Sequence, residues 1–327
     1  MALEDKIFHN TKCEPEIVIS YFCNIDSCPY CYAREHARRT SKNMTVKEFA
    51  DVVGWFKETV PSLKGITLLG GEPTIIPNLK DYLETAARAN VYVNLFSNGS
   101  FDAGQAKMLC GNNAVNTVYF HFDQLHFERI PSHVDFFKRN IGELKNAGKD
   151  VRLRANFHGT GFDVELPLKI ASEYSIPIAW SITSPCKSMK EYARRKDFSL
   201  VENRLARFFS EARNSGLKLQ LVRPVPICAF SEEVFEEFRE FAQLDRKCNV
   251  STYVHPNRVV QFCSVMDNTR TGPVNSAEEL KKAILKFQKL EIVLRGKPSF
   301  DACNSCKKFK TICQGGCLAY KVFGDRT

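Results

Sequence analysis

Three cysteines stand close together near the start of the chain, in the stretch SYFCNIDSCPYCYA at positions 20–33. They are Cys23, Cys28 and Cys31, and no fourth cysteine follows nearby. Cysteine thiolates bind soft metals, and a closed zinc or iron–sulfur site ordinarily uses four ligands. A four-iron cube held by three thiolates leaves one iron without a protein ligand, so a small molecule can bind there. The spacing predicts an open iron–sulfur site, with zinc as the alternative.

A second group of cysteines lies at the other end of the sequence. The chain has thirteen cysteines, and six of them gather between residues 248 and 317: Cys248, Cys263, Cys303, Cys306, Cys313 and Cys317. Four others stand apart: Cys13, Cys110, Cys186 and Cys228. Disulfides do not persist in a reducing compartment, so two clusters separated by a cysteine-poor middle indicate metal sites.

Composition places the chain among ordinary globular proteins, because 44% of its 327 residues are hydrophobic and 25% are charged. This length suggests one large domain plus a smaller one, or two domains. The sequence starts without an apolar run and contains no stretch of about 20 apolar residues, so we expect neither a secretory signal nor a membrane span. We therefore expect a cytoplasmic protein. The net charge of +9 suits an anionic substrate or an acidic redox partner, or simply a solvated lysine-rich surface.

Short apolar or β-branched runs alternate with amphipathic runs in the first part of the chain. Strands are predicted at 16–22, 65–70, 91–96, 116–122, 151–157 and 176–182. Helices are predicted near 45–60, 77–89, 102–110, 132–147 and 163–174. Thr45 and Glu48 predict a capping box, and Gly148 predicts a left-handed helix end. This alternation predicts a parallel sheet with right-handed crossovers, without deciding whether the sheet closes into a barrel.

Polar, glycine-rich and thiol groups follow these predicted strands. The cysteine triplet follows the first strand, GGEPT the second, SNG the third, DQ the fourth and TSPCK the sixth. In parallel α/β folds the carboxyl ends of the strands meet at one rim, where the chemistry lies. The convergence predicts an enzyme.

The cysteine triplet together with LLGGEPT resembles the radical S-adenosylmethionine (SAM) superfamily. The usual triplet is C-x3-C-x2-C with an aromatic residue before the last cysteine, a place that Tyr30 fills. Here four residues instead of three separate Cys23 from Cys28, which implies a bulge or an altered loop. The resemblance implies a partial (β/α)6 TIM-like barrel and a [4Fe-4S] cluster on the three cysteines. It also implies that SAM binds the open iron and is cleaved by one electron to a 5'-deoxyadenosyl radical, which abstracts hydrogen from a substrate.

The same resemblance implies a set of SAM-binding residues. Gly70, Gly71 and Glu72 match the GGE motif, in which glycines allow close backbone approach and a carboxylate accepts from the amino group of SAM. Ser97 and Asn98, followed by Gly99, occupy the third-strand position. His121, Asp123 and Arg154 either reach the ribose or carboxylate of SAM or are structural polar residues with satisfied hydrogen bonds.

The C-terminal cysteines, which follow a predicted helix at 231–244, resemble the SPASM domain, which carries auxiliary four-iron clusters. Its pattern is C-x9–15-G-x4-C, then C-x2-C-x5-C-x3-C, then a final cysteine. Arg258 stands at the glycine position, one extra residue precedes Cys313, and the final cysteine has no counterpart. The resemblance implies a radical SAM barrel over 1–225 and a small cysteine-rich iron–sulfur domain over 226–327.

The resemblance also divides these cysteines between clusters. It implies one cluster on Cys248, Cys263 and Cys317, which Cys228 completes. A second cluster would be held by three thiolates, with an open or non-cysteine fourth ligand: Cys303, Cys306 and Cys313. The alternatives are a single auxiliary cluster on the four closely spaced cysteines, or a zinc ribbon. Iron content separates them: about four per chain leaves no auxiliary cluster, about eight leaves one and about twelve leaves two.

For the substrate, the resemblance favours a peptide that is crosslinked, epimerised or oxidised. The alternative is dehydrogenation, epimerisation or decarboxylation of a small sugar- or nucleotide-like metabolite. Only 22 residues precede Cys23, so we expect no fused leader-binding domain at this end, which favours a small molecule or a peptide delivered by a separate partner. A low-potential donor such as flavodoxin or ferredoxin would supply electrons. A remote alternative is a non-catalytic metal-binding module that contacts nucleic acid.

The loop TSPCKSMKEYARRK offers candidates for substrate chemistry. Cys186 is either a hydrogen-atom donor to a substrate radical or a small buried residue. Four cations in the loop suit a carboxylate or phosphate: Lys187, Lys190, Arg194 and Arg195.

Overall fold

The computed structural model describes residues 14–25, 28–31, 33, 42–186, 192–244, 247–248, 251–266 and 268–324. Its centre is a single ten-stranded sheet in the order β10-β9-β8-β1-β2-β3-β4-β5-β6-β7. Neighbouring strands from β1 to β7 pair in parallel. Their bounds are β1 (Glu16–Val18), β2 (Gly65–Leu69), β3 (Tyr92–Ser97), β4 (Val115–Phe122), β5 (Asp150–Phe157), β6 (Ile178–Ile182) and β7 (Leu219–Leu221). The predicted α/β fold with its six parallel strands is confirmed, and β7 adds a seventh.

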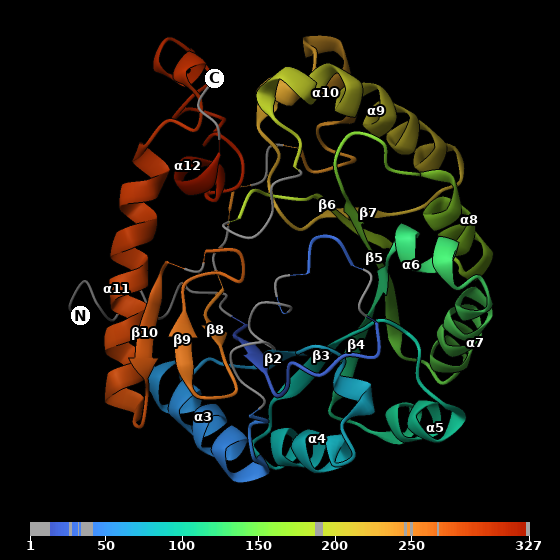
Figure 1. Ribbon diagram of the computed structural model, residues 1–327, viewed down its shortest axis with the longest axis vertical. Helices are drawn as coiled ribbons and strands as arrows, with labels where there is room; N and C mark the ends of the chain where they lie inside the picture. The colour runs from blue at the N-terminus through green and yellow to red at the C-terminus, as the bar shows by residue number, and fades with distance from the viewer. Residues whose placement is uncertain are drawn as a thin grey trace.

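Helices cover the outer face of the curved sheet, as Figure 1 shows. Along the barrel they are α3 (Val46–Thr59), α4 (Leu79–Arg88), α5 (Ala103–Gly111), α6 (Gln124–Arg129), α7 (Ser132–Asn146), α8 (Glu165–Tyr174) and α9 (Phe198–Asn214). All five predicted helices of this region are present. The capping box at Thr45 and Glu48 is formed, and Gly148 has φ +79°. Every residue of β2 and β6 is buried, because helices cover one face and the barrel interior covers the other.

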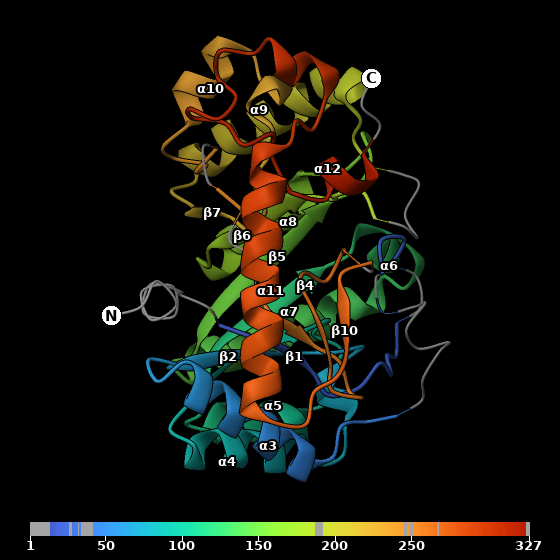
Figure 2. The ribbon, with the colours of Figure 1, turned by 90° about the vertical axis from the view of Figure 1, so that its left-hand side faces the viewer.

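The last third of the chain extends the same sheet. Its strands are β8 (Tyr253–Val254), β9 (Val259–Gln261) and β10 (Arg270–Pro273), and β8 pairs in parallel with β1. The helices are α10 (Glu232–Phe238), α11 (Ala277–Gly296) and α12 (Tyr320–Phe323). Figure 2 shows the long α11 running along this side of the molecule, and it packs against α3. The predicted 226–327 segment thus shares a sheet with the barrel.

The interior is continuous and rich in aromatic side chains. Trp180 of β6 is fully buried and packs edge-on against Phe208 and Phe209 of α9. Such edge-to-face pairs add to the free energy gained by apolar burial. No helix in the described residues is both long and apolar enough to cross a membrane.

Candidate active site

The first three thiols lie in the loop that follows β1. Cys23 is exposed, while Cys28 and Cys31 are half-buried. Although the Cys23 side chain reaches the surface, partial desolvation by its surroundings, followed by the charges of Glu72 and Cys31, raises its pKa to about 11, against a backbone hydrogen bond from Ile25 (N to Sγ, 3.3 Å). Burial and the nearby Asp123 carboxylate raise the pKa of Cys28 further. Thiols of this kind become thiolates when a cation binds next to them.

The two glycines of GGE allow the end of β2 to touch the start of the cysteine loop. A Cβ on Gly71 would lie 2.0 Å from the carbonyl oxygen of Phe22, and one on Gly70 would lie 2.4 Å from that of Ser20. The amide of Gly71 donates to Ser20 O at 2.8 Å, and the amide of Glu72 donates to Phe22 O at 2.7 Å. The open side of both glycines therefore faces the protein backbone, and SAM contact by either glycine stays a prediction.

Glu72 fixes the relative positions of the ends of β2 and β3. Its carboxylate is 1% exposed and accepts hydrogen bonds from Thr74 (N, 3.0 Å, and Oγ1, 2.6 Å), from Ser97 Oγ (2.9 Å) and from the Asn98 amide (2.6 Å). Burial raises its pKa, although these donors favour the charged form. Four bonds occupy both oxygens, so Glu72 positions Ser97 and Asn98; its predicted role as a SAM ligand is untested.

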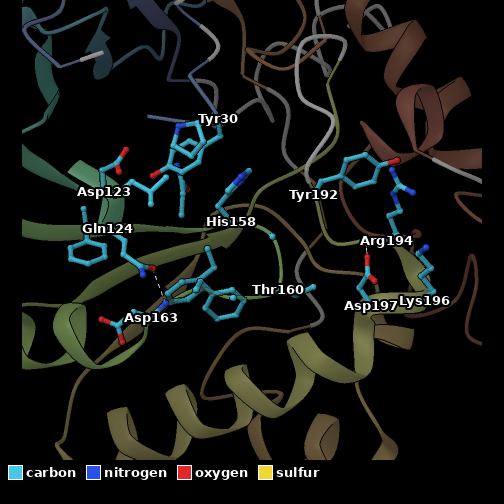
Figure 3. Close-up of a pocket in the computed structure, with 18 residues that line it drawn as sticks. Tyr30, Asp123, Gln124, His158, Thr160, Asp163, Tyr192, Arg194, Lys196 and Asp197 are labelled. Atoms are coloured by element: carbon cyan, nitrogen blue, oxygen red, sulfur yellow. Dashed lines mark hydrogen bonds between the residues drawn. The ribbon is translucent and has the colours of Figure 1, made fainter. Parts of the chain in front are cut away.

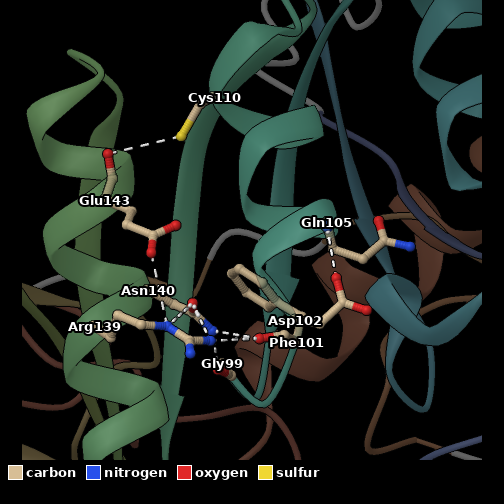
Figure 4. Close-up of polar contacts among 8 residues, drawn as sticks. All are labelled: Gly99, Phe101, Asp102, Gln105, Cys110, Arg139, Asn140 and Glu143. Atoms are coloured by element: carbon tan, nitrogen blue, oxygen red, sulfur yellow. Dashed lines mark hydrogen bonds and ion pairs between the residues drawn. The ribbon is translucent and has the colours of Figure 1, made fainter.

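Asn98 connects the third-strand loop to the first thiol. Its Nδ2 lies 2.8 Å from Asn24 Oδ1 and 3.9 Å from Cys23 Sγ. Behind it, Asn140 of α7 is fully buried and donates from Nδ2 to Gly99 O at 2.7 Å and to Phe101 O at 2.8 Å (Figure 4). Asn140 was not among the predicted site residues, because nothing in the sequence marks an asparagine on one helix as the partner of a distant loop.

At the end of β4 lies a second polar group. Tyr30 Oη lies 3.2 Å from His121 Nε2, and one ligand atom each from Cys28, His121 and Asp123 lie within 4.8 Å of one another. Burial lowers the pKa of His121 to about 4, so its imidazole is neutral near pH 7. The structure thus gathers His121 and Asp123 beside the cysteine loop.

Arg154, on β5, is buried more deeply than the cysteine loop. It is 4% exposed and donates from Nη1 to Ala179 O at 3.1 Å and from Nη2 to Ser181 Oγ at 3.0 Å. Burial and then the charge of Arg223 lower its pKa to about 9. These contacts within β5 and β6 favour the structural interpretation over contact with SAM.

A cavity of about 580 Å³ opens beside Tyr30. One wall comes from Tyr30 and Asp123–Leu125, the floor from the loop 156–163, and the far wall from Tyr192, Arg194 and the segment 196–197. Figure 3 shows Tyr30 and Asp123 on one side, Arg194, Lys196 and Asp197 on the other, and His158 between them.

The floor loop was not among the predicted site residues. The stretch HGTGFD, at 158–163, follows β5 directly and is a polar, glycine-rich turn of the same kind as GGEPT. That position in the sequence is the signal by which the loop could have been found.

The structure places the two arginines of the predicted substrate loop in different surroundings. Arg194 lines the cavity, whereas Arg195 lies near Cys228, since it lowers the pKa of that thiol. Cys186 is 9% exposed, belongs to the hydrophobic core and is not among the cavity-lining residues in the described part of the chain. Its burial favours a small core residue over a hydrogen donor. Lys187 and Lys190 lie outside the described residues.

The C-terminal thiols separate into two sets, which we name by their members. The 248-set is Cys248, Cys263 and Cys317, whose thiols interact with one another, and the 303-set is Cys303, Cys306 and Cys313, all of which interact with Cys228. In the 248-set, a hydrogen bond from Cys248 and the positive charge of the buried Arg223 lower the pKa of Cys317 to about 6 against the effect of burial. Cys228 lies beside the 303-set, whose thiols contribute to the raised pKa of Cys228.

The fold and the site together define an α/β barrel with a thiol centre at the carboxyl ends of its parallel strands. Residues 17–162 match the profile of the radical SAM superfamily, so this part of the chain is a radical SAM domain. That domain carries the predicted cysteine triplet, the GGE motif and the strand ends around them.

Three solved structures share this fold. Streptococcus suis SuiB bound to precursor peptide SuiA is 17% identical, with a TM-score of 0.64, over 98% of this chain and 77% of SuiB. Native anSMEcpe with bound AdoMet is 19% identical, with a TM-score of 0.67, over 92% of this chain and 88% of that one. The same protein with AdoMet and the Kp18Cys peptide is 19% identical, with a TM-score of 0.68, over 93% of this chain and 88% of that one. Curated protein sequences give no match.

Proposed function

We propose that this chain is a radical SAM enzyme that abstracts hydrogen from a peptide, and so crosslinks, epimerises or oxidises it. The observation that supports this is the arrangement at the barrel rim, where the thiol loop, the Glu72–Asn98 network and a large cavity lie side by side. The peptide is suggested by the shared fold, since two of the similar structures are described with bound peptides.

The residues present fit the implied cluster. Cys23, Cys28 and Cys31 would hold a [4Fe-4S] cluster whose open iron takes SAM. The three thiols lie in one short loop after β1, and thiolates are the ligands that such clusters take. When bound, the cluster and SAM supply one-electron cleavage to a 5'-deoxyadenosyl radical.

The protein's own residues would then bind and orient. Glu72 holds the ends of β2 and β3 together, and Asn98, next to Cys23, would contact SAM there. Tyr30, in the thiol loop, lines the cavity and is held by its contact with the neutral His121, so it would orient a substrate next to the cysteines. Arg194, on the far wall, would pair with a substrate carboxylate or phosphate.

We also propose a low-potential electron donor such as flavodoxin or ferredoxin. An acidic donor protein is attracted to a positively charged surface. This chain carries a net charge of +9, which suits such a donor. Thirteen cysteines without a disulfide-like pattern fit a reducing compartment, so we propose the cytoplasm.

The class is tested by anaerobic reconstitution with iron and sulfide, followed by SAM, dithionite and mass spectrometry for 5'-deoxyadenosine. We expect product from the wild type and from Cys110→Ala, a half-buried cysteine on α5, but none from Cys28→Ala. A reconstituted wild type that holds iron yet leaves SAM whole contradicts the proposal. A colourless, zinc-loaded protein from anaerobic purification also contradicts it.

A second candidate is radical chemistry on a small anionic metabolite. It is favoured by the cavity, because about 580 Å³ lies within the range of about 300–1,000 Å³ found for small-molecule sites. Stimulation of 5'-deoxyadenosine formation by an added sugar nucleotide, but not by cysteine-containing peptides, would select this candidate. Salt-dependent RNA binding without any SAM cleavage would instead support the nucleic-acid alternative.

Hydrogen donation by Cys186 is tested separately. If Cys186 is the donor, Cys186→Ala should leave SAM cleavage intact and abolish deuterium uptake from D₂O into the product. Unchanged deuterium labelling would exclude the role and leave Cys186 as a core residue.

A further inference from the structure

Three carboxylates line the large cavity, and two of them already bind the local backbone. Asp163 caps α8, because its Oδ1 accepts from the Glu165 amide at 2.8 Å and its Oδ2 accepts from the Leu166 amide at 3.3 Å. Asp197 Oδ2 accepts from the Arg194 amide at 3.1 Å, at the start of a short 3-10 turn. Both carboxylates thus hold the wall of the cavity, as capping carboxylates do.

The third carboxylate, that of Asp123, has one buried oxygen without a hydrogen-bond donor. Its side chain is 4% exposed, and its Oδ1 accepts from the His126 amide at 3.0 Å. Within the described residues, no hydrogen bond reaches Oδ2, and the nearby Cys28 thiol offers no positive charge. A buried negative charge is costly unless a cation pairs with it. Asp123 lines the cavity, so a ligand can supply that cation.

The opposite wall of the cavity carries two cations. Lys196 is exposed, and in the part of the chain that the structure describes no hydrogen bond or ion pair holds it. The guanidinium carbon of Arg194, also exposed, lies 5.9 Å from the centre of the Tyr192 ring. Figure 3 shows Asp123 on one side of the cavity and both cations on the other. Asp197 offsets one of the two positive charges, which leaves the other for a ligand.

Apolar side chains make up much of the remaining lining. The rings of Phe157 and Phe162 stack with their centroids 4.5 Å apart, and both line the cavity together with Phe122 and Leu125. A volume of about 580 Å³ is that of a space about 10 Å wide, which about three residues of extended chain can span. A free amino acid carries its ammonium and carboxylate on one carbon, so it is too short to reach both charged ends.

We infer that the cavity recognises a peptide segment in which a basic and an acidic residue lie two or three positions apart. The inference rests on the proposed peptide substrate and adds the kind of peptide that fits. The basic side chain would pair with Asp123, and the acidic side chain would pair with Lys196 and Arg194. A neutral hydroxyl, such as a sugar offers, would leave the buried charge of Asp123 uncompensated.

The inference is tested by binding alone, with the reconstituted full chain, SAM and no reductant, so that no radical forms. Equilibrium dialysis followed by mass spectrometry compares three acetylated and amidated peptides: GKGGEG, GKGGQG and GMGGEG. The wild type should bind GKGGEG at least about tenfold more tightly than either of the others, because each of them lacks one charged partner. Tighter binding of UDP-glucose than of GKGGEG would overturn the inference in favour of a sugar nucleotide.

Two conservative variants separate the two ends of the cavity. Lys196→Met should remove the preference for glutamate over glutamine and keep the preference for lysine over methionine. Asp123→Asn should do the reverse, and asparagine can still cap α6. The control is Lys169→Met, an exposed lysine of α8 that does not line the cavity, which should bind all three peptides as the wild type does. A merely structural role would not change the two preferences separately.

The possible results separate this inference from the proposed function. If no peptide binds although the protein holds iron and SAM, the peptide substrate is wrong and the inference fails with it. If the three peptides bind equally, the peptide substrate stands and the charge assignment is overturned. If Asp123→Asn releases SAM but keeps the preference for lysine, Asp123 binds SAM and not the peptide. Iron content and circular dichroism confirm that each variant is loaded and folded.

Discussion

Replacement of the buried Asn140 by alanine should loosen the loop that positions Asn98 next to the first thiol. The Asn140 side chain is fully buried and donates two hydrogen bonds, to Gly99 O at 2.7 Å and to Phe101 O at 2.8 Å. Phe101 O keeps a weaker donor, because Arg139 Nη2 lies 3.3 Å away. The variant therefore leaves chiefly Gly99 O without its donor.

The size of the effect follows from these contacts. Each lost bond costs about 0.5–1.5 kcal/mol, and an unsatisfied buried carbonyl costs about 1–3 kcal/mol. For Asn140→Ala we expect a loss of about 2–4 kcal/mol in the free energy of unfolding. In a chain of this size that lowers the melting temperature by about 3–6 °C.

The assay is thermal unfolding followed by circular dichroism, with Asn146→Ala as the matched control. Asn146 is on the same helix but exposed, so its replacement should change stability by less than about 0.5 kcal/mol. Iron retained by the Cys23 site should also fall in Asn140→Ala. Equal melting temperatures for the two variants would refute the argument that Asn140 anchors the loop.

Three other substitutions test the site and the fold. Gly71→Ala puts a methyl group 2.0 Å from Phe22 O and should lower the iron bound by the cysteine triplet at least about twofold. Gly54→Ala, with open space around the added methyl group, should leave the iron content unchanged. Equal iron in the two variants would contradict the close approach of Gly71 to Phe22. Arg194→Ala should raise the KM of an anionic substrate about tenfold, equivalent to about 1.4 kcal/mol, and leave substrate-free SAM cleavage unchanged; an unaltered KM would remove Arg194 from recognition. Burial opposes the ionisation of Glu48, but hydrogen bonds from Lys42 and Thr45 outweigh it and lower the pKa of Glu48 to about 2. The ionised Glu48 therefore stabilises the folded protein above about pH 4.5, and this stabilisation is lost as the pH falls toward 2. Chemical denaturation should show that Glu48→Gln reduces this acid-induced loss by about 1 kcal/mol, and parallel wild-type and variant curves would contradict that.

Local sequence was sufficient to predict the parallel α/β sheet, whereas its barrel shape was implied by the family resemblance. Buried strands and amphipathic helices differ in the period of their apolar residues, so six strands and five helices could be recognised without tertiary information. The capping box at Thr45 is equally local, because both partners lie within one turn. Parallel topology then required the thiol triplet, GGE and SNG to meet at one rim.

Short or irregular elements escaped prediction. The strands β7 to β10 contain two to four residues each, too few to show a period. They are held by pairing with strands remote in sequence, and β8 owes its place to β1. The neighbours of Gly71 were also unpredictable, because the sequence shows that a close approach is allowed but not what approaches.

By itself, then, the sequence determined which residue types carry the chemistry and on which strand ends they stand, since those depend on local periodicity and on the direction of the chain. Only the tertiary structure decided which distant segments lie against each other. The packing of Pro226 against Gly316 brings the segment that carries Cys228 to the C-terminal cysteines. Contacts between remote segments are set by how whole elements pack, which no motif records.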